Sequence, residues 1–323
     1  MKRLLAISLI AVALGLGAAP VSAQQYPVRT VTVVVPYPAG GSVDGVARIL
    51  AQKLGEALGQ SFIVENRAGG AGGAVGANAV AKSPADGHTL MLTASIHVIT
   101  PFLSKSLPYD VVRDFTPISL VASGPLLVST APNVSANDLK SFFELVRSNP
   151  GKYTFATSSY GSAGHLAIEL LKRDAKLDTL VISYKGAGPM LNDLMGGQIQ
   201  LVADPMLSSL PLARGGKIKA LGVTSLTRVA AAPEIPTVAE AGMTGFEFAS
   251  WYGLWGPKDL PPAVVAKLHE AAANVLARPD VKERLNVLGF EAIGSTPDFF
   301  GKYIDTEMAK YAKIIKDANI KPE

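Results

Sequence analysis

Short runs of β-branched and aliphatic residues alternate along this chain with stretches whose apolar residues recur at helical spacing. Residues 31–35 (Val-Thr-Val-Val-Val) predict a buried strand, and the apolar positions from Val46 to Leu58 then recur every three or four residues, which predicts a helix. Further strands are predicted over residues 62–65, 89–95, 126–130, 154–157, 180–184, 199–203 and 218–223, with helices between most of them. This alternation favours parallel-rich α/β sheets covered on both faces.

After residue 257 the pattern changes to helices without strands of comparable strength. These helices are predicted over residues 262–277, 280–288 and 297–318. We expect this segment to pack back on the first domain, so that the chain crosses between two domains near residues 122–125 and again near residues 248–255. The predicted lobe 1 is therefore discontinuous (residues 24–123 and 249–323), and the predicted lobe 2 is residues 124–248.

The N-terminus predicts an export signal. Lys2 and Arg3 precede an uncharged apolar run from Leu4 to Gly17, and Val21-Ser22-Ala23 is typical of a cleavage site. A membrane anchor is the alternative, but the run is short for a membrane span. We expect residues 1–23 to be removed and the mature protein to reside in the periplasm.

Composition narrows the classes of function. The sequence contains no cysteine, which excludes a disulfide framework, a zinc–thiolate site, a cysteine nucleophile and a lipid-anchored N-terminal cysteine. Loss of Lys2 and Arg3 lowers the formal charge from +4 to +2, and no Lys/Arg tract is present. We therefore expect no nucleic-acid partner.

The turn between the first strand and the first helix is a candidate anion site. It spans residues 37–44, where Gly40 and Gly41 allow positive φ and a close approach of the backbone. Ser42 is the predicted N-cap, and Asp44 in the first turn complements the helix dipole. A helix start of this kind directs N–H groups at one small volume, which suits an anion. The alternative is an ordinary capped turn without a ligand.

A second turn of the same kind follows the strand at residues 154–157. Hydroxyl side chains gather there before a helix, at Thr157, Ser158, Ser159 and Ser162. His165 in the first turn of that helix is either a catalytic residue or, as we favour, a partly exposed helical one. The two turns together predict an anion site with contributions from both domains.

Three further residues follow predicted strands, where α/β proteins place ligand groups. Lys185 lies in a glycine turn over residues 184–189 and either meets an anion or is a solvated surface lysine. Asp204 ends the strand at residues 199–203 and either binds ligand or caps the next segment. Ser95 holds the equivalent place in the first domain.

Enzyme signatures fail on inspection. The glycine run at residues 70–76 has Val75 in the third glycine position of a dinucleotide fingerprint, and no P-loop lysine follows any glycine turn. Residues 160–164 lack the first glycine of a nucleophile elbow, and His269 has no second histidine four residues on. We expect no enzymatic activity, no cofactor and no metal. A secreted serine hydrolase on Ser162 or Ser42 is the less favoured alternative.

Taken in order, these motifs resemble the Bug family, the periplasmic solute receptors of tripartite tricarboxylate transporters. The matching stretches are residues 26–27, 36–44, 64–67, 86–90, 107–110, 160–166, 184–189, 196–198, 236–242 and 251–254. The resemblance implies an α/β, two-lobed type II periplasmic binding protein fold. Each lobe would be a mostly parallel sheet flanked by helices, with the ligand in the cleft between the lobes.

The resemblance also implies a function. The protein would capture a small carboxylate (a dicarboxylate, an aromatic carboxylate or an acidic amino acid) by lobe closure and deliver it to a large and a small integral-membrane transporter subunit. A solute sensor for a signalling partner is the alternative, and we expect a monomer. The implied ligand-binding residues are Tyr37, Ala39, Gly40, Gly41, Ser42, Asp44, Ser95, Thr157, Ser158, Gly161, Ser162, Ala163, Gly164, His165, Lys185, Gly186 and Asp204. Thr100 replaces the Asn that the family favours before Pro101, and nearby His97 either tunes specificity or faces solvent.

Overall fold

The first lobe is built on a parallel sheet, as its β-branched runs predict. In the computed structural model, which describes residues 26–322, β1 (Val31–Val35) lies between β2 (Phe62–Asn66) and β3 (Thr89–Ala94) and is parallel to both. The helical elements that follow these strands are α2 (Ser42–Leu58), the short η1 (Ala71–Gly73), α3 (Ala74–Ala81) and α4 (Ile96–Leu103). The predicted export signal at residues 1–23 lies outside the described residues.

The second lobe repeats this arrangement. β5 (Phe155–Thr157) lies between β6 (Val181–Ser183) and β7 (Leu201–Pro205) and is parallel to both. The other elements of this lobe are α5 (Leu139–Arg147), α6 (Ala163–Ala175), α7 (Ala187–Met195), α8 (Met206–Arg214) and β8 (Lys219–Val223). In both lobes the turns after the parallel strands therefore lead directly into helices.

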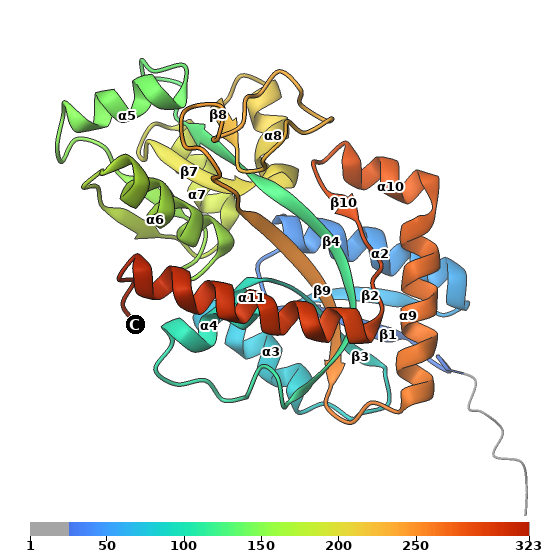
Figure 1. Cartoon of the computed structure of the whole chain (residues 1–323). Helices are drawn as coiled ribbons and strands as arrows, with labels where there is room; N and C mark the ends of the chain where they lie inside the picture. The colour runs from blue at the N-terminus through green and yellow to red at the C-terminus, as the bar shows by residue number, and fades with distance from the viewer. Residues whose placement is uncertain (1–25, 323) are drawn as a thin grey trace, which may run out of the picture.

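Two long antiparallel strands join the lobes. β4 (Phe115–Thr130) pairs with β9 (Ala249–Pro257) as far as Pro125 opposite Ala249, and from Leu126 onward β4 pairs with β7 and β8. Figure 1 shows β4 and β9 running side by side through the middle of the molecule. The segments that we expected only as crossings are thus strands, and each parallel core is extended by antiparallel partners. The exchange of partners after Pro125 supports the lobe boundaries at residues 123/124 and 248/249, which we keep as a proposal.

The C-terminal segment is helical and covers the first lobe. It comprises α9 (Pro262–Ala277), α10 (Pro279–Asn286), the short β10 (Glu291–Ala292) and α11 (Pro297–Asp317). Helices α9 and α11 each begin with proline in the first turn, where its missing N–H group costs no intrahelical hydrogen bond. α9 packs on α2. α11 packs on β4 and contacts both α4 and α6, so α11 spans the two lobes (Figure 1).

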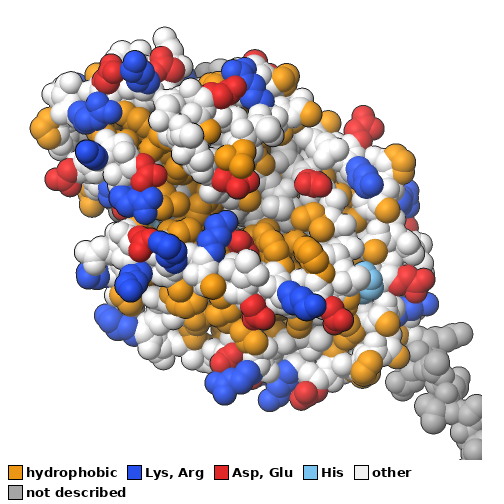
Figure 2. Space-filling model, in the orientation of Figure 1, with side chains coloured by type: hydrophobic (Ala, Val, Ile, Leu, Met, Phe, Trp, Pro, Cys, Tyr) orange, Lys and Arg blue, Asp and Glu red, His pale blue; other side chains and the backbone are white. Residues whose placement is uncertain are grey.

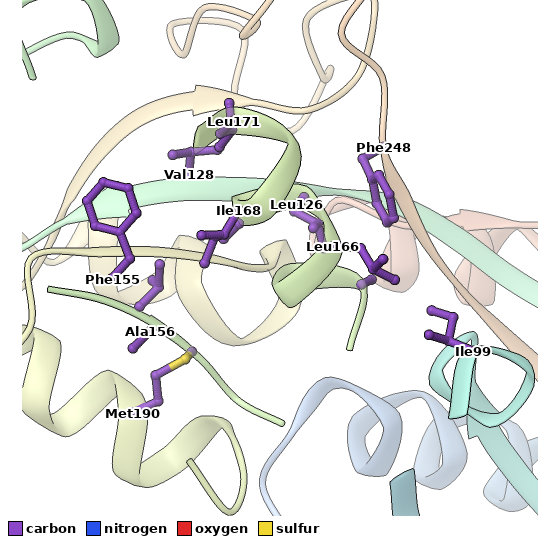
Figure 3. Close-up of a cluster of buried hydrophobic side chains, with 14 of the residues drawn as sticks. Ile99, Leu126, Val128, Phe155, Ala156, Leu166, Ile168, Leu171, Met190 and Phe248 are labelled. Carbon is purple, nitrogen blue, oxygen red and sulfur yellow. The ribbon is translucent and has the colours of Figure 1, made fainter. Parts of the chain in front are cut away.

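Apolar side chains hold the lobes together on the side of α11. Figure 3 shows Ile99 of α4 approaching Leu166 of α6, with Phe248 beside them, and all three are buried. They belong to a core that continues through Leu126, Val128, Phe155 and Leu171 of the second lobe. Full burial of such a side chain is worth about 1.5–3 kcal/mol in folding, so this core stabilises the arrangement of α4 and α6 in the structure.

The visible surface carries charges of both signs. Lys and Arg side chains are interspersed with Asp and Glu over the face in Figure 2, without a patch of one sign. Within residues 26–322, no helix is long and apolar enough to cross a membrane.

Candidate functional site

A cavity of about 610 Å³ opens between the lobes, where the turns after the parallel strands face one another. Residues of both lobes line the cavity, and β9 contributes Ser250 and Tyr252. Most of the predicted ligand-binding residues are among those lining it: Tyr37, Ala39, Gly41, Ser42, Asp44, Ser95, Ser158, Ser162, Ala163, Gly164, Lys185, Gly186 and Asp204. The predicted residues that do not line it are Gly40, Thr157, Gly161 and His165.

The start of α2 faces the cavity without a side-chain cap. Gly41 is the N-cap and Ser42 is the first helical residue, so the prediction that Ser42 caps the helix is wrong. The Ser42 hydroxyl instead accepts a hydrogen bond from the Tyr252 hydroxyl of β9 at 3.0 Å. Because the first N–H groups of a helix have no intrahelical partner, an uncapped start leaves them for a bound anion.

Asp44 is occupied by its own lobe. Its carboxylate accepts hydrogen bonds from the Gly40 N–H at 3.1 Å, Arg48 at 3.0 Å and Asn66 at 3.0 Å. Burial alone would raise the pKa of Asp44, but the hydrogen bonds from these three partners prevail and hold it below its ordinary value. Gly40 supports this arrangement with a positive φ of 87°, as predicted for the turn. Asp44 therefore fixes the turn.

The start of α6 is capped and tightly packed. Ser162 is its N-cap: Ser162 Oγ accepts from the His165 N–H at 3.2 Å and shares a hydrogen bond with Thr157 Oγ1 at 2.7 Å. Only glycine fits at position 164, since a Cβ there would lie 2.1 Å from the carbonyl oxygen of Ala203 in β7. This close contact brings the helix start to the end of β7, beside the cavity.

His165 lies behind the cavity and supports it. The side chain is buried, so the favoured expectation of a partly exposed residue is wrong, and its Nδ1 accepts a hydrogen bond from the Gly161 N–H at 3.1 Å. Burial, helped by the positive charge of Lys172, lowers the pKa of His165 to about 4, so the ring is neutral at physiological pH and can act as this acceptor. Within residues 26–322, neither Ser162 nor Ser42 forms a hydrogen bond with a histidine side chain, so the arrangement gives the hydrolase alternative no support.

The turn before α7 completes the second-lobe side. Gly186 caps α7 with a positive φ of 118° and no side-chain bond, and its N–H donates to the Ser158 carbonyl at 2.8 Å. It also meets the first lobe, because a Cβ at Gly186 would lie 3.3 Å from Cγ of Pro38. Lys185 in the same turn is exposed, lines the cavity and has no ion-pair partner among the described residues.

Asp204 and Ser95 place polar groups on the wall of the cavity. Asp204 is 1 % exposed, and burial raises its pKa to about 7 although the Ser208 hydroxyl donates to its Oδ2. Ser95, at the end of β3, is fully buried, and its hydroxyl has no partner within residues 26–322. Both residues lie where the strand ends predicted ligand groups.

Several residues that line the cavity were not predicted from the sequence. Tyr252 and Ser250 come from β9, Gly69 and Gly70 come from the loop before η1, and Gly73 is the last residue of η1. The glycine run was a usable signal: a Cβ at Gly73 would lie 2.7 Å from the Pro36 carbonyl oxygen, so glycine lets this loop pack under the first turn. No local sequence pattern marks Tyr252 as a lining residue, because β9 reaches the cavity only through its pairing with β3 and β4, which are distant in sequence.

His97 and Thr100 lie outside the cavity. His97 is 1 % exposed among the rings of Tyr109, Phe115 and Trp255, so the expectation that it faces solvent is wrong. Thr100 is also buried and donates a hydrogen bond to the Ile96 carbonyl at 2.6 Å. Neither side chain lines the cavity, so the structure gives no support to a role of His97 in specificity.

Comparisons with known proteins agree on one family. Residues 46–320 match the family described as "Tripartite tricarboxylate transporter family receptor". Protein BugT of Bordetella pertussis is 36 % identical over 323 residues, which cover 99 % of each chain. The solved structure of R. palustris Rpa4515 with adipate has a TM-score of 0.90 and 35 % identity, covering 92 % of this chain and 100 % of that one. The structure of the periplasmic binding protein BugD has a TM-score of 0.87 and 36 % identity over the same shares of the chains.

Proposed function

Because this chain belongs to the tripartite tricarboxylate transporter receptor family, we propose that it captures a small organic carboxylate in the periplasm and delivers it to a membrane transporter. The family is one of receptors, and the two-lobed type II fold agrees with that role. Adipate, bound by Rpa4515, is the kind of ligand that we propose. The expected transporter partners are a large and a small integral-membrane subunit.

One observation carries the proposal: both lobes direct hydrogen-bond donors into the same cavity. The first lobe offers the uncapped start of α2 and the unpartnered hydroxyl of Ser95. The second lobe offers the uncapped start of α7 and the ammonium group of Lys185, which forms no ion pair within residues 26–322. A carboxylate held between the lobes would receive donors from both.

Lobe closure follows from this division of donors. A ligand stabilises the closed form only as far as it binds that form better than the open one. If the closed form is populated at about 1 % without ligand, the apparent binding free energy is reduced by about 2.7 kcal/mol. Two charge-assisted hydrogen bonds of roughly 1.5–3 kcal/mol each offset that reduction. We therefore propose that the cavity binds weakly when open and firmly when closed.

A thermal-shift screen of small carboxylates, adipate among them, tests the proposal. A ligand at about 100 times its dissociation constant should raise the free energy of unfolding by about 2.7 kcal/mol. We expect Gly41→Val to weaken binding at least tenfold in calorimetry, because Gly41 has ordinary extended backbone angles and a new side chain there would cover the start of α2. Ser162→Ala should weaken binding less and cost about 1 kcal/mol of stability through the lost cap.

A matched control comes from α11. Gly301→Val introduces the same side chain at a glycine with open space around it, outside the cavity lining. Because Gly301 does not line the cavity, this variant should bind as the wild type does. The proposal fails if no carboxylate in the screen shifts the melting temperature, and the site assignment fails if Gly41→Val binds as tightly as Gly301→Val.

A further inference from the structure

Of the two acidic side chains that line the cavity, Asp204 is the one that the protein leaves uncompensated. Asp44 is held by Arg48, Asn66 and a backbone N–H. For Asp204, the Ser208 hydroxyl donates to Oδ2. Within residues 26–322, no group donates to Oδ1 and no basic side chain forms an ion pair with the carboxylate. The cavity therefore contains a buried acceptor that its own walls do not satisfy.

The position of Asp204 is fixed by the sheet, not by a mobile loop. Its backbone pairs with Leu127 of β4, and Ala203 before it packs against Gly164 at the start of α6. The side chain therefore stays in the wall beside the helix starts. Leaving a buried carboxylate without partners is costly, and a hydrogen-bond donor on a ligand would remove part of that cost.

The cavity thus contains two opposite chemistries. The starts of α2 and α7 and the Lys185 ammonium group attract an anion, whereas ionised Asp204 repels an anion and accepts a hydrogen bond from a donor. A donor-free dicarboxylate satisfies only the first chemistry and places its second negative charge near Asp204. A ligand with a carboxylate at one point and a hydroxyl or ammonium group at another satisfies both.

We propose that Asp204 selects hydroxy- or amino-carboxylates by accepting a hydrogen bond from the hydroxyl or ammonium group of the bound ligand. This inference rests on the proposed function and narrows its substrate class. Hydrogen bonds to a charged group are worth roughly 10- to 100-fold in affinity, and an analogue without the donor forfeits that factor. Burial of Asp204, which raises its pKa to about 7, is consistent with a carboxylate that lacks a compensating partner in the ligand-free protein.

Matched ligand sets test the proposal by calorimetry on the intact mature protein. The first set is succinate, malate and aspartate, which share a four-carbon diacid and differ in a hydrogen, a hydroxyl or an ammonium group at one carbon. The second set is glutarate, 2-hydroxyglutarate and glutamate, and the third is propanoate, lactate and alanine. Adipate serves as a longer donor-free acid. In at least one set, the wild type should bind a donor-bearing member about 10- to 100-fold more tightly than the donor-free one.

Two variants assign that preference to Asp204. Asp204→Ala should bring the donor-bearing and donor-free members of the set to within about threefold of each other. Asp204→Asn keeps a neutral acceptor, so it should retain part of the preference for a hydroxyl and lose that for an ammonium group. Asp178→Asn, at an exposed aspartate outside the cavity lining, should leave the preference unchanged. Melting temperatures of all variants verify that they are folded.

The outcomes separate the role of Asp204 from the proposed function of the protein. Equal binding of all members of every set, binding of donor-free acids alone, or a preference that survives Asp204→Ala would each overturn the role of Asp204 and leave the carboxylate receptor intact. No binding of any acid in the three sets or of adipate would overturn the proposed function together with it.

Discussion

Replacing Asp204 with asparagine should make the ligand-free protein less sensitive to alkaline pH. Burial raises the pKa of Asp204 from its ordinary 3.8 to about 7 in the folded state. Between these values the folded state binds more protons at this site than the unfolded state does, so the free energy of unfolding falls as pH rises and levels off above about pH 8. From about pH 5 to about pH 8.5 this linkage removes about 3 kcal/mol from the wild type. The amide that replaces the carboxyl group in the variant carries no titrating proton, so the variant should keep that stability.

The assay is urea or thermal unfolding of the wild type and Asp204→Asn at a series of pH values without ligand. The stability difference between them should widen by about 3 kcal/mol over that range, or roughly 5 °C in melting temperature for a chain of this length. Asp178→Asn, at an exposed position, should follow the wild type throughout. A difference between wild type and Asp204→Asn that does not change with pH would refute the claim that the buried carboxylate is uncompensated.

Two more predictions concern lobe closure and the buried histidine of the first lobe. A Cβ at Gly45 of α2 would lie 3.0 Å from the side chain of Leu207 in α8 of the other lobe, so Gly45→Phe should hold the lobes apart. Binding should then weaken, and the radius of gyration measured by solution scattering should rise. Adding Leu207→Ala should restore part of the affinity. Normal affinity for Gly45→Phe would contradict this. Burial lowers the pKa of His97 to about 3 in the folded protein. As pH falls below about 6.5, the unfolded state therefore binds a proton at this site before the folded state does. The free energy of unfolding of the wild type should fall by about 2 kcal/mol between about pH 7 and about pH 5. His97→Phe should lack that share of the acid sensitivity, which pH-dependent unfolding measures.

Local hydrophobic patterns predicted most of the strands and helices but not how the lobes are joined. The strands of the two parallel cores were predicted within a residue or two, because each is a short apolar run bounded by turn residues. β9 was interpreted as a crossing, although it is a nine-residue strand buried along almost its whole length. Its sequence, with Trp251, Gly253 and Trp255, shows no alternation of apolar and polar residues. Only its pairing with β3 and β4, far away in sequence, shows its role.

The candidate site was predictable where local chemistry determines it. The turns at Gly41 and Gly186 were found because glycine before a helix start is a local signal. The prediction that Ser42 caps the helix was wrong because the helix begins one residue earlier, with Gly41 as its N-cap. The Ser42 hydroxyl instead accepts a hydrogen bond from Tyr252. Which hydroxyls are spent on the protein and which remain for a ligand depends on partners from distant strands, and the sequence pattern does not contain that information.

Some polar groups at the cavity already have hydrogen-bond partners in the protein and others do not, and this distribution supports the proposal that neither lobe binds the ligand alone. In the first lobe, the carboxylate of Asp44 is consumed by its own turn, while the hydroxyl of Ser95 and the start of α2 remain open. In the second lobe, Ser162 is consumed by the cap of α6, while Lys185 and Asp204 remain open. The first lobe therefore offers donors only, and the second offers a cation together with the uncompensated acceptor. On the proposed function, a ligand meets all of these groups only when the lobes are together. Ligand recognition and the closed arrangement then form one equilibrium, and a change that separates the lobes should weaken binding even where it touches no ligand-binding group.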